Sequence, residues 1–236
     1  VKTYIKENWL TKNPKRDGLN PTLLLMSLLL ITSFIYINDF FNAPLWMSAT
    51  GEQVFIKKEW WRAWTTLFAH ADLTHILSNL FLFFPFSYFL IGYFGYLFFP
   101  FMGFFVGGLI NLVVLWTMPD HVTLLGASGV VHWMGGAWLA LSWLVDRRES
   151  AGRRILKVIA VTIVLFAPDS FRPEVSYLSH FLGYFSGILS AIIFYFINYS
   201  KLLAQEVIEE IHEAPEDGEA FWEGTIDESE PLPEKR

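Results

Sequence analysis

The chain has 236 residues, of which 53% are hydrophobic and only 17% charged, and it contains 23 Phe and 10 Trp. This composition excludes an ordinary soluble globular domain, and the absence of cysteine excludes a disulfide framework, a thiol nucleophile and a thiolate metal site. The net charge of −6 is a poor guide to partners, because residues 202–236 carry 12 acidic and 2 basic residues, whereas residues 1–201 carry 11 acidic and 15 basic residues.

Residues 1–20 form a polar, basic segment, and six apolar runs follow it. About 20 residues suffice to cross a bilayer. Backbone groups in lipid must be satisfied within the protein, so every spanning run is predicted to be helical. The first run is read as a transmembrane helix and not as a cleavable signal peptide. The predicted fold class is therefore all-α, a polytopic membrane protein with a six-transmembrane-helix bundle over 21–199, whose spans are 21–37, 75–97, 101–118, 127–145, 155–167 and 176–199.

Basic residues cluster in the N-terminal segment and in the loop after the fourth run, which share one face of a six-span bundle. The positive-inside rule places that face, and both termini, in the cytoplasm. We expect a multi-pass protein of a bacterial-type cell (inner) membrane. The long first loop, 38–69, is predicted to lie partly in the outer headgroup layer, because aromatic residues favour the interface and it contains Trp46, Trp60, Trp61 and Trp64.

The C-terminal region is predicted to have two parts. Residues 200–213 are interpreted as an amphipathic cytoplasmic helix, because one helical stripe holds Leu202, Leu203, Val207, Ile208 and Ile211. Residues 214–236 are acidic and are predicted to be disordered. Phe221 and Trp222 in this tail offer a docking point for a cytoplasmic partner, and no nucleic-acid partner is expected.

Ionisable groups inside spans are costly and are therefore candidates for function. His70 and His75 lie at the outer end of the second run, and Asn79 lies one turn deeper on the same face as His75. Ser128 opens the fourth run, and His132 follows it after four residues. The second and fourth runs enter from the same face, so these groups are expected to meet.

The sixth run enters from that face as well. It places His180, Gly183 and Gly187 on one side of a helix, and small residues let a second helix approach closely. A serine at a helix N-terminus has unpaired backbone N–H groups and the positive end of the helix dipole beside it, which suits a developing oxyanion. Ser128 is thus a candidate nucleophile and His180 a candidate base.

These motifs together resemble the rhomboid family of intramembrane serine proteases, over residues 55–190. The resemblance rests on Trp61-Arg62, on His70, His75 and Asn79, on Gly126-Ala127-Ser128-Gly129, and on His180-x-x-Gly183-x-x-x-Gly187. It implies a Ser-His dyad of Ser128 and His180 without a cofactor or metal. It also implies an oxyanion hole from His75, Asn79 and the Ser128 backbone N–H, a lesser supporting role for His70, close helix packing at Gly126, Gly129, Gly183 and Gly187, and transmembrane proteins as substrates.

The chain departs from the family pattern at two places. His132 stands where many members have a tyrosine that stacks on the catalytic histidine, so it either stacks on His180 or competes for Ser128. The inner end of the second run lacks the acidic residue that many members carry. Trp61-Arg62 is interpreted as structural, and the segment 168–175 before the sixth run is expected to act as a movable cap.

Two other functions stay open at this point. A non-catalytic rhomboid relative would bind and escort membrane proteins, although both dyad residues are present. A metal site would use the histidines with Asp72, but the sequence has no H-E-x-x-H pattern, and this reading leaves the Gly-Ala-Ser-Gly turn unexplained.

Overall fold

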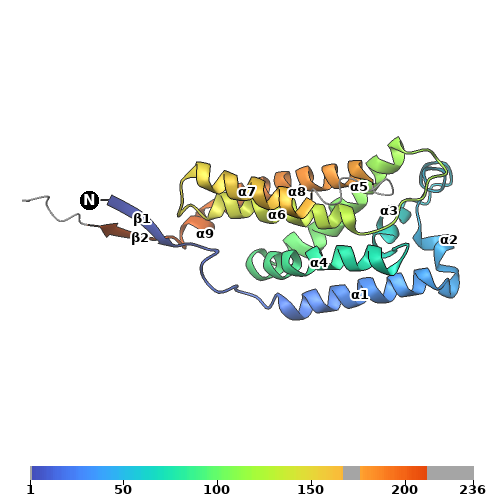
Figure 1. Ribbon diagram of the computed structural model, residues 1–236, viewed down its shortest axis with the longest axis horizontal. Helices are drawn as coiled ribbons and strands as arrows, with labels where there is room; N and C mark the ends of the chain where they lie inside the picture. The colour runs from blue at the N-terminus through green and yellow to red at the C-terminus, as the bar shows by residue number, and fades with distance from the viewer. Residues whose placement is uncertain (1, 167–175, 212–236) are drawn as a thin grey trace, which may run out of the picture.

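The computed structural model describes residues 2–166 and 176–211, and most of these residues are helical (Figure 1). The expected cap at 168–175 and the acidic tail at 214–236 lie outside the described residues. The long helices are α1 (Leu19–Ile37), α4 (Leu73–Phe89), α5 (Gly103–Thr117), α6 (Ser128–Val145), α7 (Ala151–Phe166) and α8 (Tyr177–Ile197).

One long helix overlaps each of the six predicted runs. In the described part of the chain, four helical stretches are long and apolar enough to cross a membrane, namely Leu19–Ile37, Leu73–Phe94, Leu97–Thr117 and Tyr177–Ile197. The second stretch is α4 with the π-helix η4 (Leu90–Phe94), and the third is the π-helix η5 (Leu97–Met102) with α5. Helices α6 and α7 fall outside this group, and α7 begins at Ala151, four residues before the expected start.

A glycine separates the second and third stretches. Gly95 has φ +89°, a conformation that residues with a side chain rarely adopt. A Cβ there would lie 2.9 Å from the guanidinium carbon of Arg16. The chain therefore reverses direction at this point, with the N-terminal segment packed against the turn.

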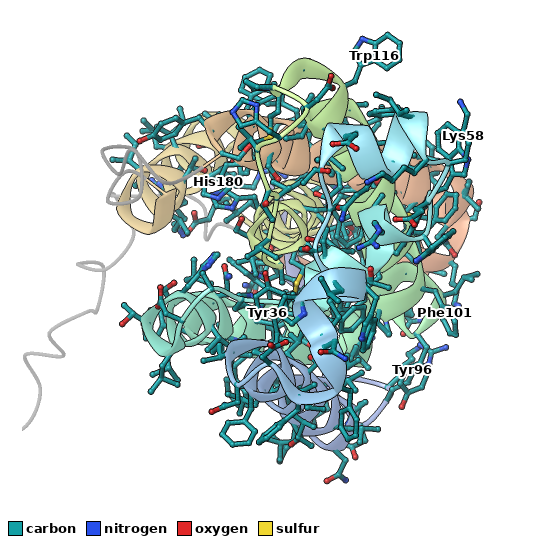
Figure 2. The ribbon with its side chains drawn as sticks, turned by 90° about the vertical axis from the view of Figure 1, so that its right-hand side faces the viewer. Tyr36, Lys58, Tyr96, Phe101, Trp116 and His180 are labelled. Carbon is teal, nitrogen blue, oxygen red and sulfur yellow. The ribbon has the colours of Figure 1, made fainter. Side chains whose placement is uncertain are left out.

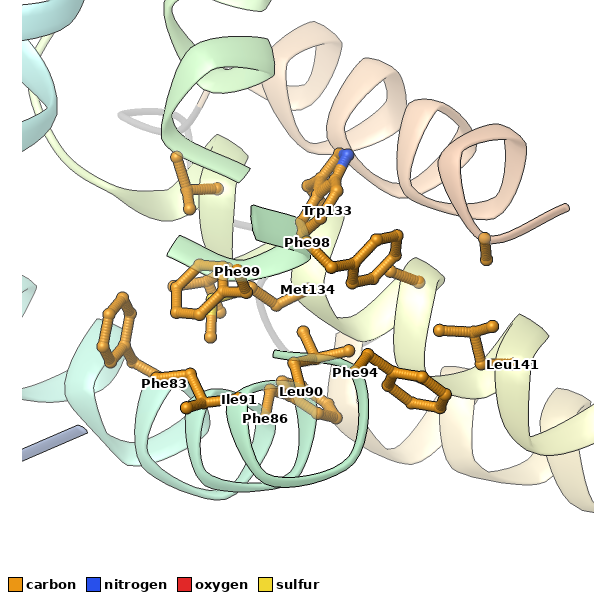
Figure 3. Close-up of a cluster of buried hydrophobic side chains, with 14 of the residues drawn as sticks. Phe83, Phe86, Leu90, Ile91, Phe94, Phe98, Phe99, Trp133, Met134 and Leu141 are labelled. Carbon is orange, nitrogen blue, oxygen red and sulfur yellow. The ribbon is translucent and has the colours of Figure 1, made fainter. Parts of the chain in front are cut away.

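Helix α6 lies in the middle of the helix group, between α4 on one side and α7 and α8 on the other (Figure 1). Twelve of its 18 residues are buried. Large side chains of α6, α4, η4 and η5 form the main apolar core, shown in Figure 3. The fully buried members Trp133 and Met134 of α6 and Phe98 and Phe99 of η5 pack at its centre. Within a bilayer, a core of this kind is stabilised by van der Waals packing between the helices and not by removal of apolar surface from water.

The connection between α1 and α4 is built from short helices. These are η1 (Phe40–Asn42), α2 (Ala43–Met47), η2 (Glu52–Ile56), α3 (Arg62–Thr65) and η3 (Thr66–Phe68). Arg62 holds them together, because its guanidinium donates to the carbonyl oxygens of Ser48 at 2.9 Å and Leu45 at 2.6 Å and pairs with Glu59. Arg62 is 6% exposed and Trp61 is 54% exposed. Within the Trp61-Arg62 motif, the arginine is therefore the residue that fixes the loop.

The prediction of an amphipathic helix over 200–213 is wrong for residues 207–211, which form a strand. Helix α9 (Tyr199–Leu203) ends early, and β2 (Val207–Ile211) pairs antiparallel with β1 (Lys2–Glu7). The side chain of Glu209 accepts from Tyr4 and Lys6 across the sheet. The helical stripe in the local sequence could not reveal a strand partner about 200 residues away, which supplies the backbone hydrogen bonds and the opposite charge.

Candidate active site

A cavity of about 740 Å³ lies among the first turns of α4, α6 and α8. Ser128, His180, His75 and Asn79 all line this cavity, as does Gly126. Figure 2, a view along the helices, shows His180 within the helix group, whereas Lys58, Trp116, Phe101 and Tyr96 lie at its periphery. The structure therefore brings together four groups that the sequence placed in three separate runs.

Ser128 is the first residue of α6, and the residue before it, Ala127, offers no side chain to cap the helix. The first N–H groups of an α-helix have no intrahelical acceptor, and the helix dipole places partial positive charge there. The first turn of α6, with its unpaired backbone N–H groups, thus faces the cavity. A negative charge that develops beside Ser128 would be stabilised at this point.

The turn that leads into α6 requires glycine at position 126. Gly126 has φ +105°, and a Cβ at this position would lie 2.9 Å from the Cε1 and Nε2 atoms of His75. Both the backbone conformation and the space are unavailable to other residues. The imidazole of His75 can therefore lie directly against the turn before Ser128.

The start of α4 is fixed by a side-chain cap. The Oδ1 atom of Asp72 accepts from the backbone N–H of His75 at 2.8 Å, which satisfies one of the free donors at this helix end. One turn deeper, Asn79 is 7% exposed, and its Nδ2 group has no hydrogen-bond partner among the described residues. A buried amide without an acceptor is costly, so this group can accommodate an oxygen atom of a molecule that enters the cavity.

His70 lies behind the cavity wall and is fully buried. Its Nε2 accepts from the backbone N–H of Ala127 at 3.2 Å, so Nδ1 carries the proton and donates to Ser33 Oγ at 2.9 Å. Burial, with a smaller contribution from the charge of His75, lowers the pKa of His70 from 6.5 to about 3. His70 thus ties the residue before Ser128 to α1, and both of its ring nitrogens are used by the protein.

The rings of His132 and His180 are stacked, with centroids 3.8 Å apart and planes inclined by 16°. The Nδ1 group of His132 donates to the carbonyl oxygen of Ser128 at 2.8 Å, because a carbonyl oxygen can only accept. Of the two arrangements that the sequence left open for His132, the structure contains the stack on His180. His132 therefore links the first turn of α6 to the imidazole on α8.

Glycines bring α6 and α8 into backbone contact beside these rings. A Cβ on Gly183 would lie 2.3 Å from the carbonyl oxygen of Gly129, and a Cβ on Gly187 would lie 2.9 Å from the backbone nitrogen of Ala137. A Cβ on Gly129 would lie 2.6 Å from the Oγ atom of Ser179. The helices can approach this closely only because small residues face each other, and this approach places His180 and Ser128 on the same cavity.

Comparison with known proteins identifies the family of the chain. Residues 57–196 match the family model described as "Rhomboid domain", which covers more than half of the chain. The chain belongs to the rhomboid family. It is also similar to "Putative rhomboid protease YdcA" of Bacillus subtilis (strain 168), with 29% identity over 166 residues that cover 65% of this chain and 80% of the relative. The resemblance drawn from the motifs is thus confirmed, and the protein is an integral membrane protein of this family.

One residue that lines the cavity was not predicted from the sequence. Asn111 of α5 is 2% exposed, lines the cavity, and donates through Nδ2 to the carbonyl oxygen of Ala63 at 2.8 Å. It therefore connects the cavity wall to α3 and to the loop that Arg62 organises. An asparagine inside the apolar run 101–118 was the available signal, because polar residues in spans have partners or functions.

The metal alternative receives no support from the geometry. Among residues 2–166 and 176–211, no three His, Asp or Glu side chains come together in an arrangement that would hold a metal ion. His70 uses both nitrogens in bonds to Ser33 and Ala127, as described above, so it has no lone pair left for a ligand bond.

Proposed function

We propose that this rhomboid is an intramembrane serine protease that cleaves peptide bonds in or near transmembrane segments of membrane proteins. The observation that carries the proposal is that Ser128, His180, His75 and Asn79 line one cavity at the N-terminus of α6. A hydroxyl, an imidazole and several donors at a positive helix end are the groups that acyl transfer requires. The family and its named relative support the same reaction class.

In the proposed mechanism, one ring nitrogen of His180 takes the proton of Ser128 while the Oγ atom attacks the scissile carbonyl. The resulting oxyanion accepts hydrogen bonds from the Ser128 backbone N–H, from His75 and from Asn79. His180 then delivers the proton to the leaving amine, and an acyl-enzyme remains. Water, deprotonated by His180, attacks this ester; the bond to the Ser128 oxygen breaks, that oxygen takes the proton from His180, and the second product leaves as a carboxylic acid.

The proposed mechanism needs His180 to keep one orientation through both proton transfers. In the triad template a carboxylate holds the histidine. Here the stacked ring of His132 provides a flat surface against His180, and its own bond to the Ser128 carbonyl fixes that surface. We infer that His132 is a positioning residue that takes part in no bond-making step.

We further propose that α6 and α7 also cross the membrane, which gives six spans with both termini on the cytoplasmic side. The first turns of α4, α6 and α8 lie toward the end that carries α2 and α3, and β1, β2 and α9 lie at the opposite end (Figure 1). The basic residues of the N-terminal segment and of the α6–α7 turn lie at that opposite end. The positive-inside rule then directs the cavity to the outer face.

The test is labelling of the purified protein in detergent with a fluorophosphonate probe, which reacts with activated serines. We expect wild type and Ser78→Ala to be labelled, and Ser128→Ala and His180→Ala to be unlabelled. Ser78 is the matched control, because it lines the same cavity, has no assigned role in the proposed mechanism, and donates its hydroxyl to the carbonyl oxygen of His75. A folded wild type that resists the probe would refute the protease and favour the escort protein, whereas labelling that survives Ser128→Ala would refute the assigned nucleophile.

A further inference from the structure

A second cavity lies between the C-terminal end of α6 and the N-terminal half of α7, far along α6 from Ser128. It has a volume of about 340 Å³. Its polar end is lined by side chains from the α6–α7 turn and the first turns of α7, namely Asp146, Arg148, Glu149, Arg154 and Lys157. The proteolytic mechanism proposed above uses none of these residues.

The charges at the polar end leave one cation without an acidic partner. Arg148 pairs with Asp146 through two bonds of 2.8 Å, and Lys157 pairs with Glu149 at 2.7 Å. Arg154 has no carboxylate partner in the described part of the chain. Three cations and two carboxylates give the cavity lining a net charge of +1. An occupant with one negative charge would complete this arrangement.

Arg154 is fixed by contacts with Trp143 and still has an N–H group without an acceptor among the described residues. Its guanidinium donates to the carbonyl oxygen of Trp143 and lies 5.3 Å from the centroid of the Trp143 ring. The Nε group of Arg154 and the Nε1 group of Trp143 are buried and have no acceptor among the described residues. Buried donors of this kind carry a desolvation cost unless an acceptor arrives, and a guanidinium is well suited to phosphate oxygens.

The other end of the cavity is apolar. Leu139 of α6 and Val161 of α7 line it, and each lies seven residues along its helix from the polar end, at Asp146 and Arg154 respectively. At 1.5 Å per residue, the apolar end is about 10 Å from the charges. The neighbouring face of α7 exposes Ile159 by 48% and Ile163 by 59%. The cavity thus combines a charged head and an apolar stem, which is the shape of an amphiphile.

We propose that this cavity binds the phosphodiester headgroup of an anionic phospholipid, with an acyl chain along α6 and α7. The proposal rests on the membrane placement of α6 and α7 proposed above, and it is independent of the protease assignment. Arg154 and Trp143 supply the donors for the phosphate oxygens, and Arg148 and Lys157 add positive potential. A zwitterionic headgroup would bring its own cation to a lining that is already positive, so it is disfavoured. Basic pockets between membrane helices are a known means of recognising anionic headgroups.

The test compares two neighbouring arginines. Arg153→Gln and Arg154→Gln remove the same charge from adjacent positions of α7, but only Arg154 lines the cavity, and Arg153 is exposed. Phosphatidylglycerol or phosphatidylcholine is titrated into protein purified in detergent, and native mass spectrometry counts the lipids retained. We expect wild type and Arg153→Gln to prefer phosphatidylglycerol, and Arg154→Gln to retain it at least about fivefold less well, since one arginine near an anionic headgroup contributes about 1 kcal/mol.

Several outcomes would overturn the proposal. These are equal retention of the two lipids by wild type, equal retention of phosphatidylglycerol by the two arginine variants, and an equal loss in both. Inorganic phosphate is added in a separate arm, and if millimolar phosphate displaces phosphatidylglycerol from wild type, the site is a free-phosphate site instead. Val161→Asp serves if Arg154→Gln fails to fold, because it charges the apolar end and leaves Arg154 in place; unchanged lipid retention there would also refute the acyl-chain assignment. Failure of fluorophosphonate labelling would leave all of these readouts unchanged.

Discussion

Replacing Gly183 by alanine would place a methyl carbon 2.3 Å from the carbonyl oxygen of Gly129, whereas ordinary van der Waals contact begins near 3.4 Å. The obstacle is backbone on a packed helix, which cannot rotate away as a side chain can. Helices α6 and α8 must therefore separate by about 1 Å, the difference between these two distances. Overpacking of this kind typically costs about 1–3 kcal/mol of stability.

The same separation would act on the proposed dyad, because Ser128 is on α6 and His180 is on α8. A misplacement of about 1 Å at a reacting group typically costs about 10²-fold in rate. We expect Gly183→Ala to lower the rate of fluorophosphonate labelling by about this factor, while the protein stays folded. Labelling rate and the midpoint of thermal unfolding in detergent are measured on the same preparation.

Gly152→Ala is the matched control, since Gly152 lies in the first turn of α7 and a Cβ there meets nothing within 4 Å. Its labelling rate should equal that of wild type, and its midpoint should be equal or higher, because alanine favours a helix over glycine by up to about 1 kcal/mol. If Gly183→Ala were labelled at the wild-type rate with an unchanged midpoint, close packing of α6 and α8 would not be what positions the dyad.

Three further predictions address residues around Ser128. His132→Phe keeps a ring on His180 but loses the 2.8 Å bond to the Ser128 carbonyl, so it should retain more labelling than His132→Ala; equal loss in both would assign the effect to the hydrogen bond alone. Asn79→Ala should lower kcat for cleavage of a transmembrane substrate by about 10²–10³-fold, as loss of one oxyanion donor does, and an unchanged kcat would remove Asn79 from the oxyanion hole. His70 has a folded pKa of about 3 and an ordinary pKa of 6.5, so the unfolded state binds the extra proton; the stabilisation is complete above pH 6.5 and is lost as pH falls toward 3. Between pH 6.5 and 5 wild type should lose about 2 kcal/mol through this group, and His70→Gln should show a shallower fall in unfolding midpoint over the same range.

Much of the site could be predicted from the sequence because its parts are local. Helical periodicity alone predicts three of these parts. They are the helix N-terminus at Ser128, the four-residue spacing from His75 to Asn79, and the shared face of the histidine and two glycines in 176–199. The cavity they share follows from three helices that enter from one side. Their catalytic roles stay predictions until the labelling experiment is done.

The features that escaped prediction depend on contacts between distant segments. β2 reads as a helical stripe locally and becomes a strand only beside β1. The polarity of Asn111 inside an apolar run could be read from the sequence, but its partner, the carbonyl of Ala63, is 48 positions away in the chain. No window of the sequence contains both members of these pairs.

Helix α6 shows why the proposed nucleophile can lie on a helix whose mean hydropathy is too low for a membrane span by composition alone. It is outside the group of helices apolar enough to cross a membrane by composition, yet 12 of its 18 residues are buried against other helices. A helix surrounded by protein does not need a lipid-facing apolar surface, and its polar groups find partners within the bundle. His132 bonds to the Ser128 carbonyl, and the Trp133 indole donates to Ser190 on α8 at 3.2 Å. Because α6 is buried among other helices, it can contain small and polar residues in place of leucine. The Gly-Ala-Ser-Gly turn is therefore tolerated, and it places an accessible serine at a helix N-terminus within the bundle.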